Sequence, residues 1–165
     1  MHCTETQIHG LYLGKSKDRW AGRAPSAIDK QSTSECIYLG ALGFIGDEQA
    51  DMKVHGGTEK AVHHYAFDHY SFWNKQFNTQ KSLEPGSFGE NIAIFGVTES
   101  SVCIGDIFQL GNALVQVSQG RQPCWKLNLN SAIENLAQQF QRTANTGKYY
   151  RVLEEGSFQA GQSTR

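Results

Sequence analysis

The sequence is poor in proline and has no long apolar run. Three prolines stand against 17 glycines in 165 residues. No stretch approaches the roughly 18 apolar residues of a membrane-spanning helix. The N-terminus shows no basic region followed by an apolar one, so no secretory signal is visible. We therefore expect a cytoplasmic protein that does not enter a membrane.

An excess of charge of either sign is also absent. Lys and Arg number 15 and Asp and Glu number 16, which gives a formal net charge of -1. Because nucleic-acid-binding domains usually carry a basic excess, this balance argues against a nucleic acid partner. The length suits one domain, and we assign residues 1–165 to it.

The cysteines show no metal-site spacing. They stand at positions 3, 36, 103 and 124, and no pair forms the CxxC motif of zinc or iron–sulfur sites. A chain of this size buries roughly 68–70% of its unfolded surface, so its core needs no disulfide or metal. We expect free thiols in a reducing compartment.

Short segments rich in β-branched and aromatic residues recur between turn-forming residues. Strands are predicted at 7–13, 36–39, 61–65, 91–95, 106–110 and 114–118. Gly111-Asn112 joins the last two and is typical of a tight hairpin turn. Because the helices that follow each strand of a parallel α/β sheet are missing, the pattern favours a barrel or sandwich.

Two segments show helical periodicity. Aromatic residues gather on one side of 67–77, which predicts a helix covering one end of a barrel. Ser131 and Glu134 form a capping-box pattern that predicts the start of an amphipathic helix. The apolar positions of that helix are Ile133, Leu136, Ala137 and Phe140. Residues 155–164 are expected to fray.

Histidines cluster in the middle of the chain without a metal-binding motif. No pair has the HxH spacing of strand ligands or the HExxH spacing of a helical zinc site. His63 and His64 should point to opposite faces of a strand, so at most one faces a shared site. His69 fits a buried core residue better than a ligand. His55, next to two glycines, suits a plain turn or a ligand-binding loop equally well.

Glycine-rich phosphate loops and the GxSxG elbow of hydrolases are both absent, which leaves little support for those folds. The most informative stretch is 120–128, after the second hairpin strand. It places Cys124 between Arg121 and Lys126, a cationic setting that favours the thiolate. A thiolate is a nucleophile and a ligand for soft metals. The alternative is a small buried cysteine with a packing role.

Short sequence blocks follow one another in a specific order along almost the whole chain. They are Pro25-Ser-Ala-Ile28, Gly46-Asp-Glu-Gln-Ala50, Lys53-Val-His-Gly-Gly57, Ala61 to Tyr65, Phe88-Gly-Glu-Asn-Ile92, Thr98-Glu-Ser100, Gly105-Asp-Ile-Phe108, and Gln116-Val-Ser118 leading to Pro123-Cys-Trp-Lys-Leu-Asn128. In this order and spacing they resemble the MOSC domain family, named for the C-terminal domain of molybdenum cofactor sulfurases, and in particular its YiiM-like branch. Relatives in that branch continue into a helical C-terminal extension, whereas this sequence ends at Arg165.

The resemblance implies a mainly β fold, a closed β-barrel of the MOSC or pyruvate-kinase barrel type with a few peripheral helices. It implies a pterin-based molybdenum cofactor, with Cys124 as the protein ligand to the metal. By position in the blocks, the cofactor-binding residues would be Ser26, Lys60, Asn91, Arg121 and Gln122. His55 and His64 would face the site as catalytic residues together with Cys124.

Relatives reduce N-hydroxylated bases such as 6-N-hydroxylaminopurine to amines, a detoxifying reaction. The resemblance therefore implies an oxidoreductase acting on small N-hydroxylated compounds. His55, His64 or Glu90 would supply the proton. Because no flavin or iron–sulfur motif occurs, electrons would come from a separate reductase. Assembly as a homodimer is a further expectation.

Two alternatives to an enzyme stay open at this point. In the first, the chain is a sulfur- or molybdopterin-carrying module, in which Cys124 holds a persulfide or the protein hands the pterin to another enzyme. In the second, the chain is a catalytically idle binding domain that keeps the fold.

Overall fold

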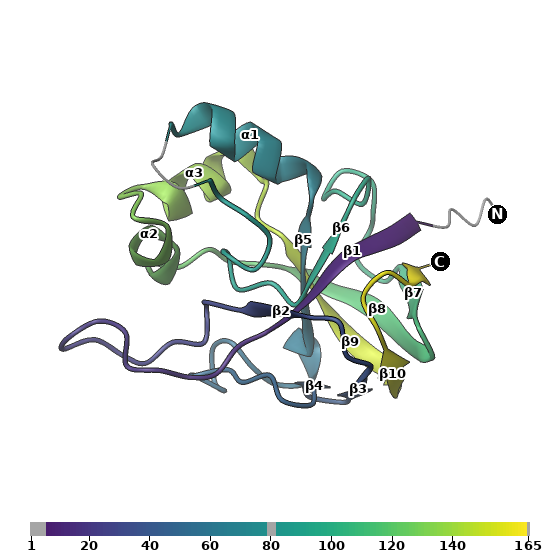
Figure 1. Ribbon diagram of the computed structural model, residues 1–165. Coiled ribbons are helices and arrows are strands. Elements are labelled where there is room, and N and C mark those ends of the chain that lie inside the picture. The colour runs from purple at the N-terminus through teal and green to yellow at the C-terminus, as the bar shows by residue number, and fades with distance from the viewer. Residues whose placement is uncertain (1–5, 79–81, 165) are drawn as a thin grey trace.

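The chain folds into curled β-structure with a few short helices. The computed structural model describes residues 6–78 and 82–164 (Figure 1). Its strands are β1 (Thr6–Leu13), β2 (Gln31–Thr33), β3 (Ile37–Gly40), β4 (Gly43–Phe44), β5 (Val62–Ala66), β6 (Ile92–Ile94), β7 (Ile107–Leu110), β8 (Ala113–Gly120), β9 (Lys148–Glu154), β10 (Gly156–Phe158) and β11 (Ser163–Thr164). Its helices are α1 (Asp68–Gln76), α2 (Lys126–Ser131) and α3 (Leu136–Thr143), with a 3-10 turn, η1, at Thr58–Lys60.

The larger sheet is strongly curled. Its strand order is β11-β7-β8-β9-β5-β6-β1-β2, and β11 also pairs with β1. β5 and β6 pair in parallel with α1 between them in the chain, whereas β5 is antiparallel to β9 and β6 to β1. A smaller sheet has the order β10-β3-β4. The mainly β fold is therefore confirmed, while full closure into a barrel stays a prediction.

The predicted hairpin is confirmed. β7 and β8 are antiparallel, with Leu110 opposite Ala113. Gly111 has φ +58°, a left-handed conformation that glycine adopts without the penalty of a Cβ. The six predicted strands correspond to β1, β3, β5, β6, β7 and β8 with small shifts at their ends.

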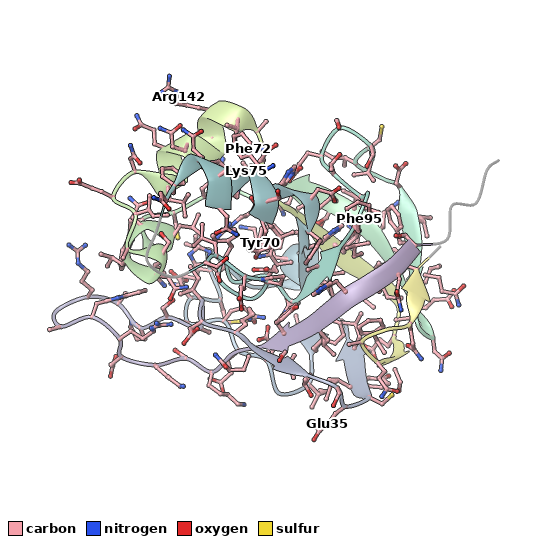
Figure 2. The ribbon with its side chains drawn as sticks, turned by 45° about the horizontal axis from the view of Figure 1, so that its top comes forward. Glu35, Tyr70, Phe72, Lys75, Phe95 and Arg142 are labelled. Atoms are coloured by element: carbon pink, nitrogen blue, oxygen red, sulfur yellow. The ribbon has the colours of Figure 1, made fainter. Side chains whose placement is uncertain are left out.

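The helix predicted at 67–77 is α1, which lies with α2 and α3 on one side of the sheet (Figure 1). Tyr70 and Trp73 are buried, and Figure 2 shows Tyr70 beneath α1. Phe72 does not share this face, because its side chain is 42% exposed. α1 thus covers the sheet with a narrower apolar face than the sequence predicts.

The capping box predicted at Ser131 is wrong. Ser131 is the last residue of α2, and its hydroxyl donates to the carbonyl oxygen of Leu127 at 2.7 Å and accepts the Ile133 N–H at 3.2 Å. The hydroxyl is occupied by its own helix, so the following helix, α3, begins only at Leu136. The amphipathic character is confirmed, since Leu136 and Phe140 are fully buried.

Two apolar clusters form the core. One fills the interior of the curled sheet, and the other is an aromatic layer beneath the helices. In that layer Tyr65 stacks on Phe140 and meets Phe88 edge-on.

The prediction that the C-terminal residues fray is wrong for β10, which pairs with β3 and buries Phe158 completely. Among the described residues, no helix has the length and apolarity to cross a membrane.

Candidate functional site

A pocket opens where six separate parts of the chain meet. Its walls come from residues 26–30 before β2, 47–50 after β4, 55–63 around η1, 88–91 before β6, and 121–126 between β8 and α2, together with Tyr149 of β9. Its empty space is about 570 Å³ with the open mouth included.

The pocket brings together most of the predicted site residues. They are Ser26, His55, Lys60, Asn91, Arg121 and Cys124. Ser26 is buried, and its hydroxyl accepts the Ile28 N–H at 3.2 Å, which fixes the turn at this wall. The convergence of residues that lie up to 98 positions apart in the chain is what the sequence blocks could not show by themselves.

His64 and Gln122 do not line the pocket. His64 is fully buried, and its Nδ1 lies 2.8 Å from the Tyr150 hydroxyl, on whose ring it stacks. Gln122 is exposed. The alternation along β5 turns His63 into the pocket wall instead. Strand alternation predicts that at most one of the two histidines faces the site, and this is confirmed. The placement of His64 in the site is wrong, because the residue that lines the pocket is His63.

Glu90, a proton-donor candidate by chemistry, is also absent from the pocket lining. It is fully buried and accepts hydrogen bonds from the Tyr70 hydroxyl, the Gly86 N–H and the Phe88 N–H. Burial raises the pKa of Glu90, and these donors oppose the shift. Glu90 holds the turn that forms one wall of the pocket.

Three cations on the pocket wall are held by backbone carbonyl oxygens. Lys60 donates to the oxygen of Val54, Arg121 to Phe88 at 2.9 Å, and Lys126 to Pro25 at 2.9 Å. A carbonyl oxygen orients a cation without neutralising it. None of the three forms an ion pair within the described residues. Their charges are therefore available to an anionic ligand.

Two buried polar atoms in the pocket residues have no hydrogen-bond partner among residues 6–78 and 82–164. They are Nη1 of Arg121 and Nε2 of His63. A buried polar group without a partner is costly, and such groups in folded proteins usually meet water or a ligand. Both residues line the pocket, so each of these buried atoms belongs to a side chain that a bound ligand would contact.

Asp47 is the centre of the network that frames the pocket. Its carboxylate accepts hydrogen bonds from the Gly14 N–H at 2.7 Å, from Lys30 Nζ at 2.5 Å and from Asn91 Nδ2 at 2.8 Å. Asn91 Oδ1 in turn accepts the His63 N–H at 3.0 Å. Asn91 is thus a framing residue of the pocket, and Lys30, unlike the three cations above, is neutralised by a carboxylate.

The histidines of the pocket are neutral at pH 7. Burial lowers the pKa of His55, and the positive charges of Lys126, Arg121 and Lys60 lower it further. Burial also lowers the pKa of His63 well below its usual range, with Arg121 acting in the same direction. A neutral imidazole has one nitrogen free to accept a proton, which suits a proton-relaying role.

Cys124 lies on the pocket wall as a partly exposed, free thiol. Cys36 and Cys103 are free and exposed away from the pocket, while Cys3 lies outside the described residues. Within the described structure, no three His, Cys, Asp or Glu side chains are grouped as metal ligands. A metal held here by Cys124 would therefore need most of its ligands from its own cofactor.

Sequence reasoning missed several pocket residues. They are Lys30, Asp47 and Tyr149. Lys126 is predicted only as a cationic neighbour of Cys124, and His64 is predicted as the site residue in place of His63. Asp47 and Lys126 stand inside recognised blocks, where their charge was the available signal. Lys30 and Tyr149 carry no local signal, because tertiary contacts alone bring them to the pocket.

Known proteins resemble this chain over most of its length. The MOSC domain family matches residues 51–165. Protein YiiM of Escherichia coli is 44% identical over 91% of this chain and 67% of its own length. A protein of Gibberella moniliformis named reductase is 38% identical over 89% of this chain and 26% of its own length. The crystal structure of YiiM from Geobacillus stearothermophilus superposes with a TM-score of 0.78 at 34% identity, covering 94% of this chain and 72% of that one.

The sequence blocks, the curled mainly β sheet and the YiiM relatives lead to one assignment. The chain belongs to the MOSC domain family and is a YiiM-like member of it.

Proposed function

We propose that this protein is an oxidoreductase that holds a molybdenum cofactor in the pocket and reduces small N-hydroxylated compounds, such as N-hydroxylated purine bases, to amines. The observation that carries the proposal is the combination of the Cys124 thiol with the cations of Lys60, Arg121 and Lys126 in the lining of one pocket. The 38% identity to a protein named reductase supports an oxidoreductase role.

The residues of the pocket fit such a cofactor. The Cys124 thiolate would be the protein ligand to the metal, because thiolates bind soft transition metals. Lys60, Arg121 and Lys126 would bind the negative phosphate of the pterin, and the unpartnered Nη1 of Arg121 has a hydrogen bond left to give. When bound, the cofactor would supply the two-electron chemistry that removes the oxygen atom of the substrate.

The protein would also supply the protons that the reaction consumes. Reduction of an N-hydroxylated amine to the amine and water consumes two electrons and two protons. The neutral imidazole of His55 lies in the pocket wall and would pass protons from solvent toward the substrate. The electrons would come from a separate reductase protein, since the sequence contains no iron–sulfur motif.

The test uses protein loaded with molybdenum cofactor in a host whose cofactor pathway is intact. Reduced methyl viologen serves as the electron donor, and conversion of 6-N-hydroxylaminopurine to adenine is followed by chromatography. The proposal predicts adenine formation by the wild type and its loss in Cys124→Ser. The absence of adenine with molybdenum-loaded wild-type protein would overturn the proposal.

A carrier function is the second candidate, because the partly exposed free thiol of Cys124 also suits a persulfide. In that case Cys124 carries sulfane sulfur and passes it to an acceptor protein. Cyanolysis of the purified protein measures sulfane sulfur directly. Sulfane sulfur that depends on Cys124, in protein without reductase activity, would favour the carrier.

A further inference from the structure

A second hollow adjoins the pocket described above and takes no part in the chemistry proposed so far. Its walls come from residues 24–25, 50–53 and 125–126. Ala50 and Lys126 line both hollows, so the two spaces share a rim. A molecule whose reacting end lies in the first pocket can therefore extend into the second.

The side chain of Trp125 lines this second hollow. It is 39% exposed and belongs to the residue that directly follows Cys124. Trp20 meets the indole edge-on at 5.8 Å between ring centroids, and the guanidinium of Arg23 lies 5.2 Å from its centroid. Both neighbours sit on the long connection between β1 and β2, which extends away from the sheet (Figure 1). These contacts hold an exposed aromatic ring in a defined position.

Met52 lines the same hollow and is 49% exposed. Its loop is ordered by Asp51, whose carboxylate accepts the N–H groups of Lys53 and Val54 at 3.0 and 3.2 Å. An aromatic and a thioether side chain, both left in water on the walls of one hollow, are typical of a binding surface for a flat apolar group.

Cations border this apolar surface. Lys53 and Lys126 line the hollow, and Lys126 keeps ammonium protons available beyond its bond to the Pro25 oxygen. Ring nitrogens of a heteroaromatic base accept hydrogen bonds. Lys126 Nζ lies 5.9 Å from the centroid of the Trp125 ring, so a base bound on that ring would meet a hydrogen-bond donor as well as an aromatic face.

We propose that the second hollow binds the flat heteroaromatic ring of the substrate by stacking on Trp125, so that Trp125 makes the enzyme prefer aromatic over aliphatic N-hydroxylated compounds. The inference rests on the proposed function, because it places the N-hydroxyl group beside the cofactor that Cys124 would hold. The ring then extends across the shared rim toward Trp125 and Met52.

The experiment compares kcat/KM for 6-N-hydroxylaminopurine and for acetamidoxime, an aliphatic N-hydroxylated compound, in molybdenum-loaded protein. Since stacking on an aromatic side chain changes affinity by about 10- to 100-fold per base, Trp125→Ala should lower kcat/KM for the purine by that factor, mainly through KM. Acetamidoxime should be unaffected, and Trp125→Phe should restore most of the purine activity. Leu129→Ala, an equally exposed residue of α2 outside both hollows, is the matched control.

A second measurement does not depend on turnover. Calorimetric titration with 6-N-hydroxylaminopurine, without an electron donor, should show binding to wild type and Trp125→Phe and at least about 10-fold weaker binding to Trp125→Ala. If the wild type binds 6-N-hydroxylaminopurine in a Trp125-dependent way but does not reduce it, the proposed function is contradicted and the ring-binding site is supported. Reduction of the purine with equal kcat/KM in wild type and Trp125→Ala, or an equal fall for both substrates, would overturn the ring site alone.

Discussion

Arg121 donates a 2.9 Å hydrogen bond from Nη2 to the carbonyl oxygen of Phe88, while its Nη1 is buried with no partner in the described structure. The bond joins the segment after β8 to the turn before β6 and points a fixed guanidinium at the pocket. The planar fork of arginine suits an anionic group such as a phosphate. Arg121 lines the pocket, so its guanidinium is a group that a bound anion would contact.

Substitution of Arg121 should weaken cofactor retention. A hydrogen bond to a charged group contributes about 1.5–3 kcal/mol, so Arg121→Ala should lower cofactor affinity roughly 10- to 150-fold. Arg121→Lys should retain part of it, because the charge remains and the fork is lost. Molybdenum content after extensive dialysis measures the effect. Arg142→Ala, on the outer side of α3 (Figure 2), is the control, and equal retention by Arg121→Ala would contradict the assignment.

Buried histidines should make the fold sensitive to acid. Burial holds the pKa of His64 well below 6.5, as it does for His63, whereas the unfolded chain takes up these protons near pH 6.5. The unfolded state then binds more protons, so stability falls as pH drops below 6.5, by up to about 1.4 kcal/mol per pH unit for each histidine. Urea unfolding at pH 7 and pH 5.5 measures this slope. His64→Gln should reduce it, and an unchanged slope would show that His64 does not contribute.

Glu90 should be needed for the fold of the pocket wall. Its carboxylate is the acceptor for Tyr70 and for two backbone N–H groups of the turn. Glu90→Ala leaves these buried donors without a partner, at about 1–3 kcal/mol each, and should destabilise the protein by at least about 3 kcal/mol. Thermal or urea unfolding gives the value. Glu35→Ala, at an exposed position (Figure 2), should change stability by less than about 0.5 kcal/mol, and an equally small effect at Glu90 would refute this role.

Local chemistry explains which features were predictable from the sequence. The turn at Gly111-Asn112 depends on two adjacent residues, and the cationic surroundings of Cys124 depend on a short segment, so both could be read directly. The orientation of β5 could not be predicted from the sequence. Alternation places His63 and His64 on opposite faces of the strand, but only the packing of β5 against Tyr150 and the pocket decides which histidine faces the pocket.

Other features depend on contacts between distant segments. The bond from Lys30 to Asp47 joins two loops, and no spacing in the sequence marks it. The prediction that a helix starts at Ser131 is wrong for a related reason. Ser131 is the last residue of α2, and its hydroxyl donates a hydrogen bond to a carbonyl oxygen of that helix. Sequence patterns therefore do not predict the pocket residues that only the tertiary fold brings together.

The most direct test of the account is the molybdenum content of wild type, Cys124→Ser and Cys36→Ser, each purified from a host with an intact cofactor pathway. Cys36→Ser is the matched control, because Cys36 is a free exposed thiol outside the pocket. The account predicts equimolar molybdenum in wild type and Cys36→Ser and its loss in Cys124→Ser. Wild-type protein without molybdenum, or Cys124→Ser with the wild-type amount, would contradict it.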